Sequence, residues 1–242
     1  MKPILVQSAV PRELKLLVTS LAESSCNVGG IFPTNEGFIG GNRIICCAGG
    51  IGKANAASAA TSLIERSQPK LIVITGCGGA YPGSGLSVGD MAVATDEIFG
   101  DDGVIAPDGW IDLKEMDLAL LNEGGRSWYN TVPLARLETE KAMQLADSHG
   151  VQLVRGRFVT VSSCSGTKAR GVELQRRCQA VCENMEGAAV ALTALRYGIP
   201  CVEIRGISNL VEDRDISRWN IGQAVENVQR FIIKLITELG KY

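Results

Sequence analysis

The segment "KLIVITG" at residues 70–76 decides the fold. Four aliphatic residues in a row, most of them β-branched, are followed by Thr75 and end at Gly76. An apolar run of this length without a polar face is typical of a strand that is buried on both sides. Strands of this kind occur in α/β proteins, where helices cover both faces of a mostly parallel sheet.

Similar short runs recur along the chain with helical segments between them, so we predict a single α/β domain over residues 1–242. Pro11 suits the first turn of a helix, and Gly198 is a plausible cap at the end of another. Residues 99–135 are rich in turn formers, and no element is predicted there. The other predicted strands are 3–9, 43–49, 90–98, 157–163 and 200–208, and the predicted helices are 11–22, 53–66, 136–148, 168–178, 185–198 and 217–239.

Composition excludes several classes of function. The formal net charge is −2, so the chain offers no basic surface for nucleic acid or an anionic membrane. No apolar run reaches the ~20 residues that span a bilayer, and the start of the chain lacks a signal-peptide pattern. The eight cysteines are scattered without a CxxC pair, which favours reduced thiols over disulfides or zinc. We therefore expect a cytoplasmic protein without a metal or other cofactor.

The glycine-rich segment "CAGGIGKANAA" at 47–57 fails the two common phosphate-binding motifs. A P-loop needs glycine where Cys47 stands and Ser or Thr where Ala54 stands. The dinucleotide fingerprint, begun at Gly50 and Gly52, needs its third glycine where Asn55 stands. The segment is thus expected to form a tight turn between a strand and a helix.

Four segments, taken in order, resemble the nucleoside phosphorylase and nucleosidase superfamily. They are "GGIGKANAA" (49–57), "TGCGGAYPGSGLSVGD" (75–90), "NMEGAAVA" (184–191) and "RGISNLVED" (205–213). Each segment alone is weak evidence for this resemblance, but the four occur in the expected order and their spacing fits nearly the whole chain. The resemblance implies a three-layer fold in which a twisted mixed sheet is flanked by helices. It also implies a small-molecule nucleoside as substrate and assembly into a homo-oligomer.

The resemblance further implies roles for three residues of a nucleosidase site. Met185 would form an apolar floor under the ribose, Glu186 would accept hydrogen bonds from its hydroxyls, and Glu13 would activate water. Bacterial phosphorylases of the superfamily hold phosphate with an arginine where this chain has Ile74. An aliphatic side chain cannot neutralise phosphate, so hydrolysis is favoured over phosphorolysis.

Asn209 indicates which base leaves. Adenine-releasing members have an aspartate there, which delivers a proton to N7, whereas an amide can only donate and accept hydrogen bonds. A 6-oxopurine needs less protonation, and 6-oxopurine-specific phosphorylases of the superfamily use asparagine. We therefore predict hypoxanthine as the leaving group. The segments 183–200 and 203–215 are similar to those of members that hydrolyse a hypoxanthine nucleoside with a long 5′ substituent.

Two further positions differ from the adenine-specific members. Asn184 stands where they have a glutamate, and Gly166 stands where an aromatic residue stacks on their base. The remaining substrate contacts are assigned to Cys77, Gly78, Thr167 and Ser208, with Gly166 and Thr167 as pocket wall. Three alternatives stay open: a methylthioadenosine/adenosylhomocysteine nucleosidase, a purine nucleoside phosphorylase and a nucleoside-binding protein without activity.

Overall fold

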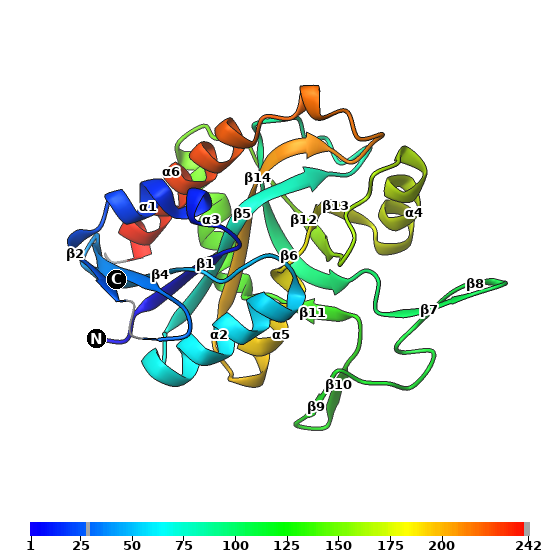
Figure 1. Ribbon diagram of the computed structural model, residues 1–242, viewed down its shortest axis with the longest axis horizontal. Helices are drawn as coiled ribbons and strands as arrows, with labels where there is room; N and C mark the ends of the chain where they lie inside the picture. The colour runs from blue at the N-terminus through cyan, green and yellow to red at the C-terminus, as the bar shows by residue number, and fades with distance from the viewer. Residues whose placement is uncertain (28–29, 240–242) are drawn as a thin grey trace.

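The computed structural model describes residues 1–27 and 30–239. Within them, a ten-stranded mixed sheet runs through the molecule, with helices on both faces (Figure 1). The strands lie in the order β11 (Thr131–Pro133), β6 (Met91–Phe99), β12 (Leu153–Thr160), β13 (Ala180–Asn184), β5 (Leu71–Ala80), β1 (Ile4–Ser8), β4 (Asn42–Ala48), β3 (Thr34–Ile39) and β2 (Ala22–Asn27). The tenth strand, β14 (Cys201–Leu210), pairs with both β5 and β6.

This double pairing of β14 closes part of the sheet into a ring of β5, β13, β12, β6 and β14. The ring needs strong local twist, and two of its strands carry register shifts. One shift in β14 lies between Ile207 and Asn209. Neighbouring residues of a regular strand point to opposite faces, and a bulge re-aims them. The bulge thus allows Ser208 and Asn209 to reach the same cavity.

Alternate residues of the central strands pack against two helical layers (Figure 1). Ile4 and Val6 of β1 belong to the core under α1 (Lys15–Thr19), α3 (Arg136–Ser148) and α6 (Ile221–Leu239). Leu5, between them, packs on the opposite face with α2 (Lys53–Ser67) and α5 (Gly187–Arg196). The sheet is therefore buried on both faces, as "KLIVITG" predicts.

Several predicted bounds differ from the structure. The predicted helix 11–22 is a 3-10 turn over Pro11–Leu14 followed by α1, which ends at Thr19. The strands β2, β3 and β13 were not predicted. The β2 sequence "AESSCN" is polar and exposed, so it lacks the apolar pattern of a strand. Strand β12 begins at Leu153 rather than at 157, because the arginines on its exposed face interrupt the apolar pattern.

Residues 99–135 form two small hairpins and the edge strand β11. The hairpins are β7 (Gly103–Ala106) with β8 (Gly109–Asp112) and β9 (Leu121–Glu123) with β10 (Arg126–Trp128). Figure 1 shows that they extend away from the sheet beside α4 (Lys168–Cys178) and α5. No helix in the described part of the chain combines the length and apolar character needed to cross a membrane.

Candidate active site

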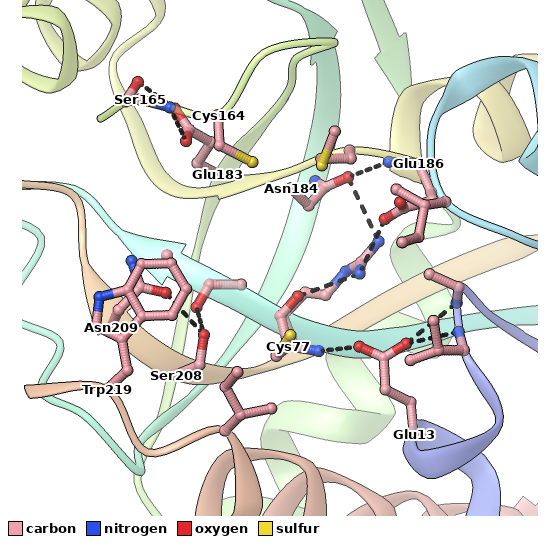
Figure 2. Close-up of a pocket in the computed structure, with 18 of the residues that line it drawn as sticks. Glu13, Cys77, Cys164, Ser165, Glu183, Asn184, Glu186, Ser208, Asn209 and Trp219 are labelled. Carbon is pink, nitrogen blue, oxygen red and sulfur yellow. Dashed lines mark hydrogen bonds and ion pairs between the residues drawn. The ribbon is translucent and has the colours of Figure 1, made fainter. Parts of the chain in front are cut away.

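A cavity of about 330 Å3 opens where the ends of β1, β5, β13 and β14 meet the start of α5. Ends of strands at such a junction are the usual place for ligands in α/β folds. Figure 2 shows side chains of β5, β13 and β14 around the cavity, together with Glu13 and with Glu186, which directly precedes α5. Its lining consists of Ala9, Val10, Arg12, Glu13, Ile51, Cys77, Gly78, Gly79, Cys164, Ser165, Glu183, Asn184, Met185, Glu186, Arg205, Ser208, Asn209, Arg214, Trp219 and Ile221.

Most of the residues that the sequence assigned to the site lie in this lining, namely Glu13, Cys77, Gly78, Asn184, Met185, Glu186, Ser208 and Asn209. Gly166 and Thr167 are not among the lining residues. Thr167 is the N-cap of α4, where its Oγ1 accepts a hydrogen bond from the Arg170 N–H at 3.3 Å. Cys164 and Ser165, which precede them in the chain, line the cavity.

Glu13 is held by backbone N–H groups of the turn after β1 and of strand β5. Its Oε2 accepts hydrogen bonds from the Ala9 and Val10 N–H groups at 3.1 and 3.2 Å. Its Oε1 accepts one from the Cys77 N–H at 2.9 Å (Figure 2). A side chain at Gly76 would collide with both Glu13 Oε1 and Arg205 Nη1. The glycine thus lets the carboxylate and the guanidinium approach the same strand.

Arg205 lies at the centre of the buried charges. Its Nε donates to Glu203 Oε1 at 2.7 Å, and its Nη1 lies 3.5 Å from Glu186 Oε2. Burial alone would lower the pKa of Arg205, but the carboxylates of Glu203, Glu186 and Glu13 raise it above its ordinary value. Arg205 is therefore charged. When the three carboxylates are ionised, they outnumber it, and the excess negative charge favours a cation in the cavity.

Glu186 is fixed on two sides. Its Oε1 accepts a hydrogen bond from the Gly52 N–H at 2.9 Å, in the turn between β4 and α2, and its Oε2 pairs with Arg205. The carboxylate is nearly buried but still lines the cavity. It therefore has a fixed orientation and retains acceptor capacity for hydroxyl groups of a ligand.

The Asn184 amide faces the protein and shapes the turn into α5. Its Oδ1 accepts hydrogen bonds from the Glu186 and Gly187 N–H groups at 2.9 and 2.7 Å. Its Nδ2 donates to Glu97 Oε1 at 2.6 Å. These bonds satisfy two N–H groups at the start of the helix. They set the position of Glu186 and give Asn184 a positioning role in addition to its place in the lining.

Ser208 and Leu210 fix the orientation of the Asn209 amide. The Ser208 hydroxyl donates to Asn209 Oδ1 at 2.8 Å, and Asn209 Nδ2 donates to the Leu210 carbonyl at 3.1 Å. An amide nitrogen carries two hydrogens, so one donor remains for a ligand. The end of the side chain in the cavity is thus a hydrogen-bond donor.

Glu183 faces Asn209 across Gly79. Gly79 of β5 is in register with Glu183 of β13 on one side and with Asn209 of β14 on the other. Glu183 accepts hydrogen bonds from Ser165 N–H, Ser165 Oγ and Tyr81 Oη at 2.8, 2.6 and 2.9 Å. All three residues line the cavity, so an acceptor and a donor lie on either side of Gly79, an arrangement that suits the edge of a flat heterocycle.

Two arginines and an aromatic ring complete the lining. The Arg214 guanidinium carbon lies 5.0 Å from the centre of the Trp219 ring, and Arg12 follows the turn that ends β1. Neither arginine takes part in an ion pair within the described ranges 1–27 and 30–239. Ile51, Val10 and Ile221 add apolar surface. This part of the cavity suits an apolar group that carries negative charge.

Sequence reasoning missed several of these residues. A signal was present for Arg205, because "CVEIRGI" places Glu203 and Arg205 two apart in an otherwise apolar strand. Charged residues on one side of a buried strand must pair, and a buried pair at a strand end indicates a site. Arg214 and Trp219 lie in loops, and no local pattern in the sequence places them at the cavity.

Comparisons with known proteins agree on the family. The model of the phosphorylase superfamily matches residues 3–238. The futalosine hydrolase of Thermus thermophilus is 34% identical over 191 residues, which cover 79% of this chain and 80% of that protein. A 5′-methylthioadenosine/S-adenosylhomocysteine nucleosidase of Bacillus cereus is 28% identical over 239 residues, which cover 98% of this chain and 99% of that protein.

Solved structures show the same fold. The nucleosidase of Neisseria meningitidis in complex with methylthio-immucillin-A superposes with a TM-score of 0.84 at 22% identity and covers 98% of this chain and 100% of that chain. The S-adenosylhomocysteine nucleosidase of Streptococcus pyogenes gives a TM-score of 0.85 at 20% identity, covering 98% and 97%. These findings confirm the predicted fold class. The chain belongs to the phosphorylase superfamily and is an N-glycosyl hydrolase, a nucleosidase.

Proposed function

We propose that this chain hydrolyses the N-glycosidic bond of futalosine and releases hypoxanthine and the dehypoxanthine product for menaquinone biosynthesis. The observation that carries the proposal is the Asn209 amide, whose oxygen is held by Ser208 so that an N–H donor faces the cavity. Hypoxanthine presents two acceptors, N7 and O6, to a donor at that place.

We also propose that the protein is cytoplasmic, because its eight free cysteines suggest a reducing compartment.

The proposed mechanism assigns one task to each part of the cavity. Met185 lies under the ribose, and Glu186 accepts hydrogen bonds from its hydroxyls. As the glycosidic bond lengthens, the excess negative charge around Arg205 stabilises the oxocarbenium-like sugar. Asn209 donates to the departing base. Glu13 orients a water molecule and takes its proton.

The substrate is inosine with a carboxyphenyl-ketone extension at C5′, and its tail needs an apolar surface with a cation. We assign that surface to Trp219 and Ile51, and the cation to Arg214 or Arg12. A methylthio group, in contrast, carries no charge. The arginines therefore favour futalosine over methylthioadenosine.

Chromatography of the purified protein with futalosine, inosine and methylthioadenosine tests the proposal. Hypoxanthine is expected from futalosine, at the same rate with and without phosphate. Adenine from methylthioadenosine would instead support the second candidate, a methylthioadenosine/adenosylhomocysteine nucleosidase. That candidate is favoured by the Bacillus relative, which matches 98% of the chain. A sugar phosphate formed only with phosphate would indicate a phosphorylase.

The arginines predict a charge preference in the tail. Conversion of the futalosine carboxylate to its methyl ester is expected to lower kcat/KM about tenfold or more, mainly through KM, because a charged hydrogen bond contributes about 1.5–3 kcal/mol. Arg214→Gln and Arg12→Gln are each compared with the wild type on acid and ester. The arginine that binds the carboxylate is the one whose replacement abolishes the preference. Equal rates for acid and ester in the wild type would contradict this assignment.

We also propose a homo-oligomer assembled through the hairpins of residues 103–128. Ile105 is 84% exposed and Leu118 is 57% exposed on this protruding region (Figure 1). Exposed apolar side chains on a projecting arm indicate a protein contact. Light scattering after gel filtration is expected to show a dimer or larger species, and Ile105→Glu is expected to shift it toward the monomer. A monomeric wild type would refute the proposal.

A further inference from the structure

Two carboxyl groups that the proposed mechanism does not use converge beneath the start of α5. Glu97 of β6 and Glu203 of β14 are both 0% exposed. A Cβ at Gly187 would collide with Glu97 Oε1 and with both carboxyl oxygens of Glu203. The absence of a side chain at Gly187 therefore leaves room for the two carboxyls to meet at one point, directly behind Glu186.

The hydrogen bonds around the two groups are one donor short. Glu97 accepts from Asn184 Nδ2 at 2.6 Å and from Thr160 Oγ1 at 2.7 Å. Glu203 Oε1 accepts from Arg205 Nε at 2.7 Å. Glu203 Oε2 is buried and has no donor among the residues that the structure describes. A buried carboxylate oxygen without a hydrogen-bond donor destabilises the protein. A proton on the neighbouring carboxyl group would supply the missing donor.

The surroundings of Glu97 favour a proton on its carboxyl group. Burial raises the pKa of Glu97 well above its ordinary value, and the charge of Glu203 and a hydrogen bond to it raise the pKa further. Glu203, in contrast, has the guanidinium of Arg205 as its direct partner at 2.7 Å. Two adjacent buried carboxyls with one proton between them are a known physical arrangement, because both cannot ionise together.

We propose that Glu97 and Glu203 share one proton and act as a positioning pair, which holds Asn184 and Arg205 in the orientation that places Glu186. The proposal rests on the proposed function in one respect, the contact of Glu186 with the ribose.

Each member of the pair supports one of the two side chains that position Glu186. Glu97 anchors Asn184, whose Oδ1 accepts from the Glu186 N–H at 2.9 Å. Glu203 anchors Arg205, whose Nη1 lies 3.5 Å from Glu186 Oε2. The backbone and the carboxylate of Glu186 thus depend on different members of the same pair. A single proton between the members leaves one negative charge to balance Arg205.

Infrared difference spectroscopy tests the shared proton without substrate. The wild type is expected to show the carbonyl stretch of a protonated carboxylic acid between about pH 6 and 8, where an ordinary glutamate is ionised. Glu97→Gln is expected to remove this band. A wild type without the band would overturn the proposal. This result does not depend on which nucleoside is the substrate, so failure of the proposed function would leave the test intact.

Steady-state kinetics of a double-mutant cycle tests the positioning role. In Glu203→Gln, Glu97 can take the negative charge, and in Glu97→Gln, Glu203 keeps it. Each single variant is therefore expected to retain kcat within about tenfold of the wild type. The double variant loses the negative charge of the pair and leaves Arg205 with only Glu186 and Glu13 as acidic neighbours. Its kcat is expected to fall about a hundredfold or more, with a smaller change in KM. Purely additive effects would overturn the proposal.

Two controls distinguish a folding defect from the proposed effect on kcat. Thermal unfolding is recorded for every variant, and the kinetics are compared only where the protein is folded at the assay temperature. Glu36→Gln is the matched control, because Glu36 pairs with Arg43 and Arg66 outside the cavity. That variant is expected to keep the infrared band and the wild-type kcat.

Discussion

Glu13→Gln is expected to lower kcat for hypoxanthine release by about 10²–10⁴-fold, the range usual for loss of a general base. Affinity for a bound nucleoside is expected to change by no more than about threefold, because the proposed mechanism has Glu13 act on water rather than on the substrate. Single-turnover kinetics with quantified hypoxanthine give the rate, and equilibrium binding of a non-hydrolysable nucleoside gives the affinity.

The geometry explains why this carboxylate suits a water molecule. An ionised carboxylate has about four acceptor positions, and three backbone N–H groups occupy three of them, from Ala9, Val10 and Cys77. About one acceptor position of the Glu13 carboxylate remains free. The three backbone hydrogen bonds keep this carboxylate in a fixed orientation. A water bound there has a fixed orientation toward the cavity, which lowers the entropic cost of attack.

The glutamine side chain has nearly the same shape as that of Glu13, but it is not basic and it loses one hydrogen bond from a backbone N–H group. Its amide nitrogen has to face one of the backbone N–H groups, so some loss of stability is expected, and thermal unfolding is measured alongside. Asp90→Asn is the matched control, since the Asp90 carboxylate also accepts a backbone N–H, from Ser87 at 2.7 Å, and lies outside the cavity. Normal turnover in Glu13→Gln would remove Glu13 from the mechanism.

The sequence allowed prediction of the fold where elements are strongly apolar or strongly periodic. The run at 70–76 belongs to β5, and α2 over Lys53–Ser67 nearly matches the predicted 53–66. The exposed strand β2 could not be found, because its polar residues carry no alternation of burial. The ring closed by β14 was also beyond prediction, since strand order depends on contacts between distant segments.

The candidate site could likewise be predicted only in part: residues in the motifs were found, and residues in loops were not. Residues inside the ordered motifs, such as Glu186 and Asn209, lie in the lining of the cavity. Gly166 was assigned by its offset from a strand, whereas the residues of that loop in the lining are Cys164 and Ser165. Arg214 and Trp219 reach the cavity from a loop. Loops follow tertiary contacts rather than local propensity, so their residues appear only in the structure.

Asn209→Asp is expected to lower kcat/KM for the hypoxanthine nucleoside by about 10²–10³-fold. In the proposed mechanism the amide donates to the N7 and O6 edge, whereas a carboxylate would place negative charge against O6 and leave that edge without a donor. The Ser208 hydroxyl can still donate to an oxygen at this position. The contact with the Leu210 carbonyl, 3.1 Å from Nδ2, changes from a hydrogen bond to a repulsion between oxygens.

The same variant is expected to gain measurable activity on an adenine nucleoside, because a carboxyl beside N7 can deliver the proton that adenine needs on leaving. The experiment therefore measures both bases from paired nucleosides, and the ratio of the two kcat/KM values is the result. Asn227→Asp controls for the loss of an amide-to-carbonyl bond, since Asn227 Nδ2 donates to the Gly89 carbonyl at 2.8 Å outside the cavity. An unchanged ratio in Asn209→Asp would show that residue 209 does not contact the base. A lower rate on both bases, with the ratio kept, would mean that the asparagine supports the site without selecting the base.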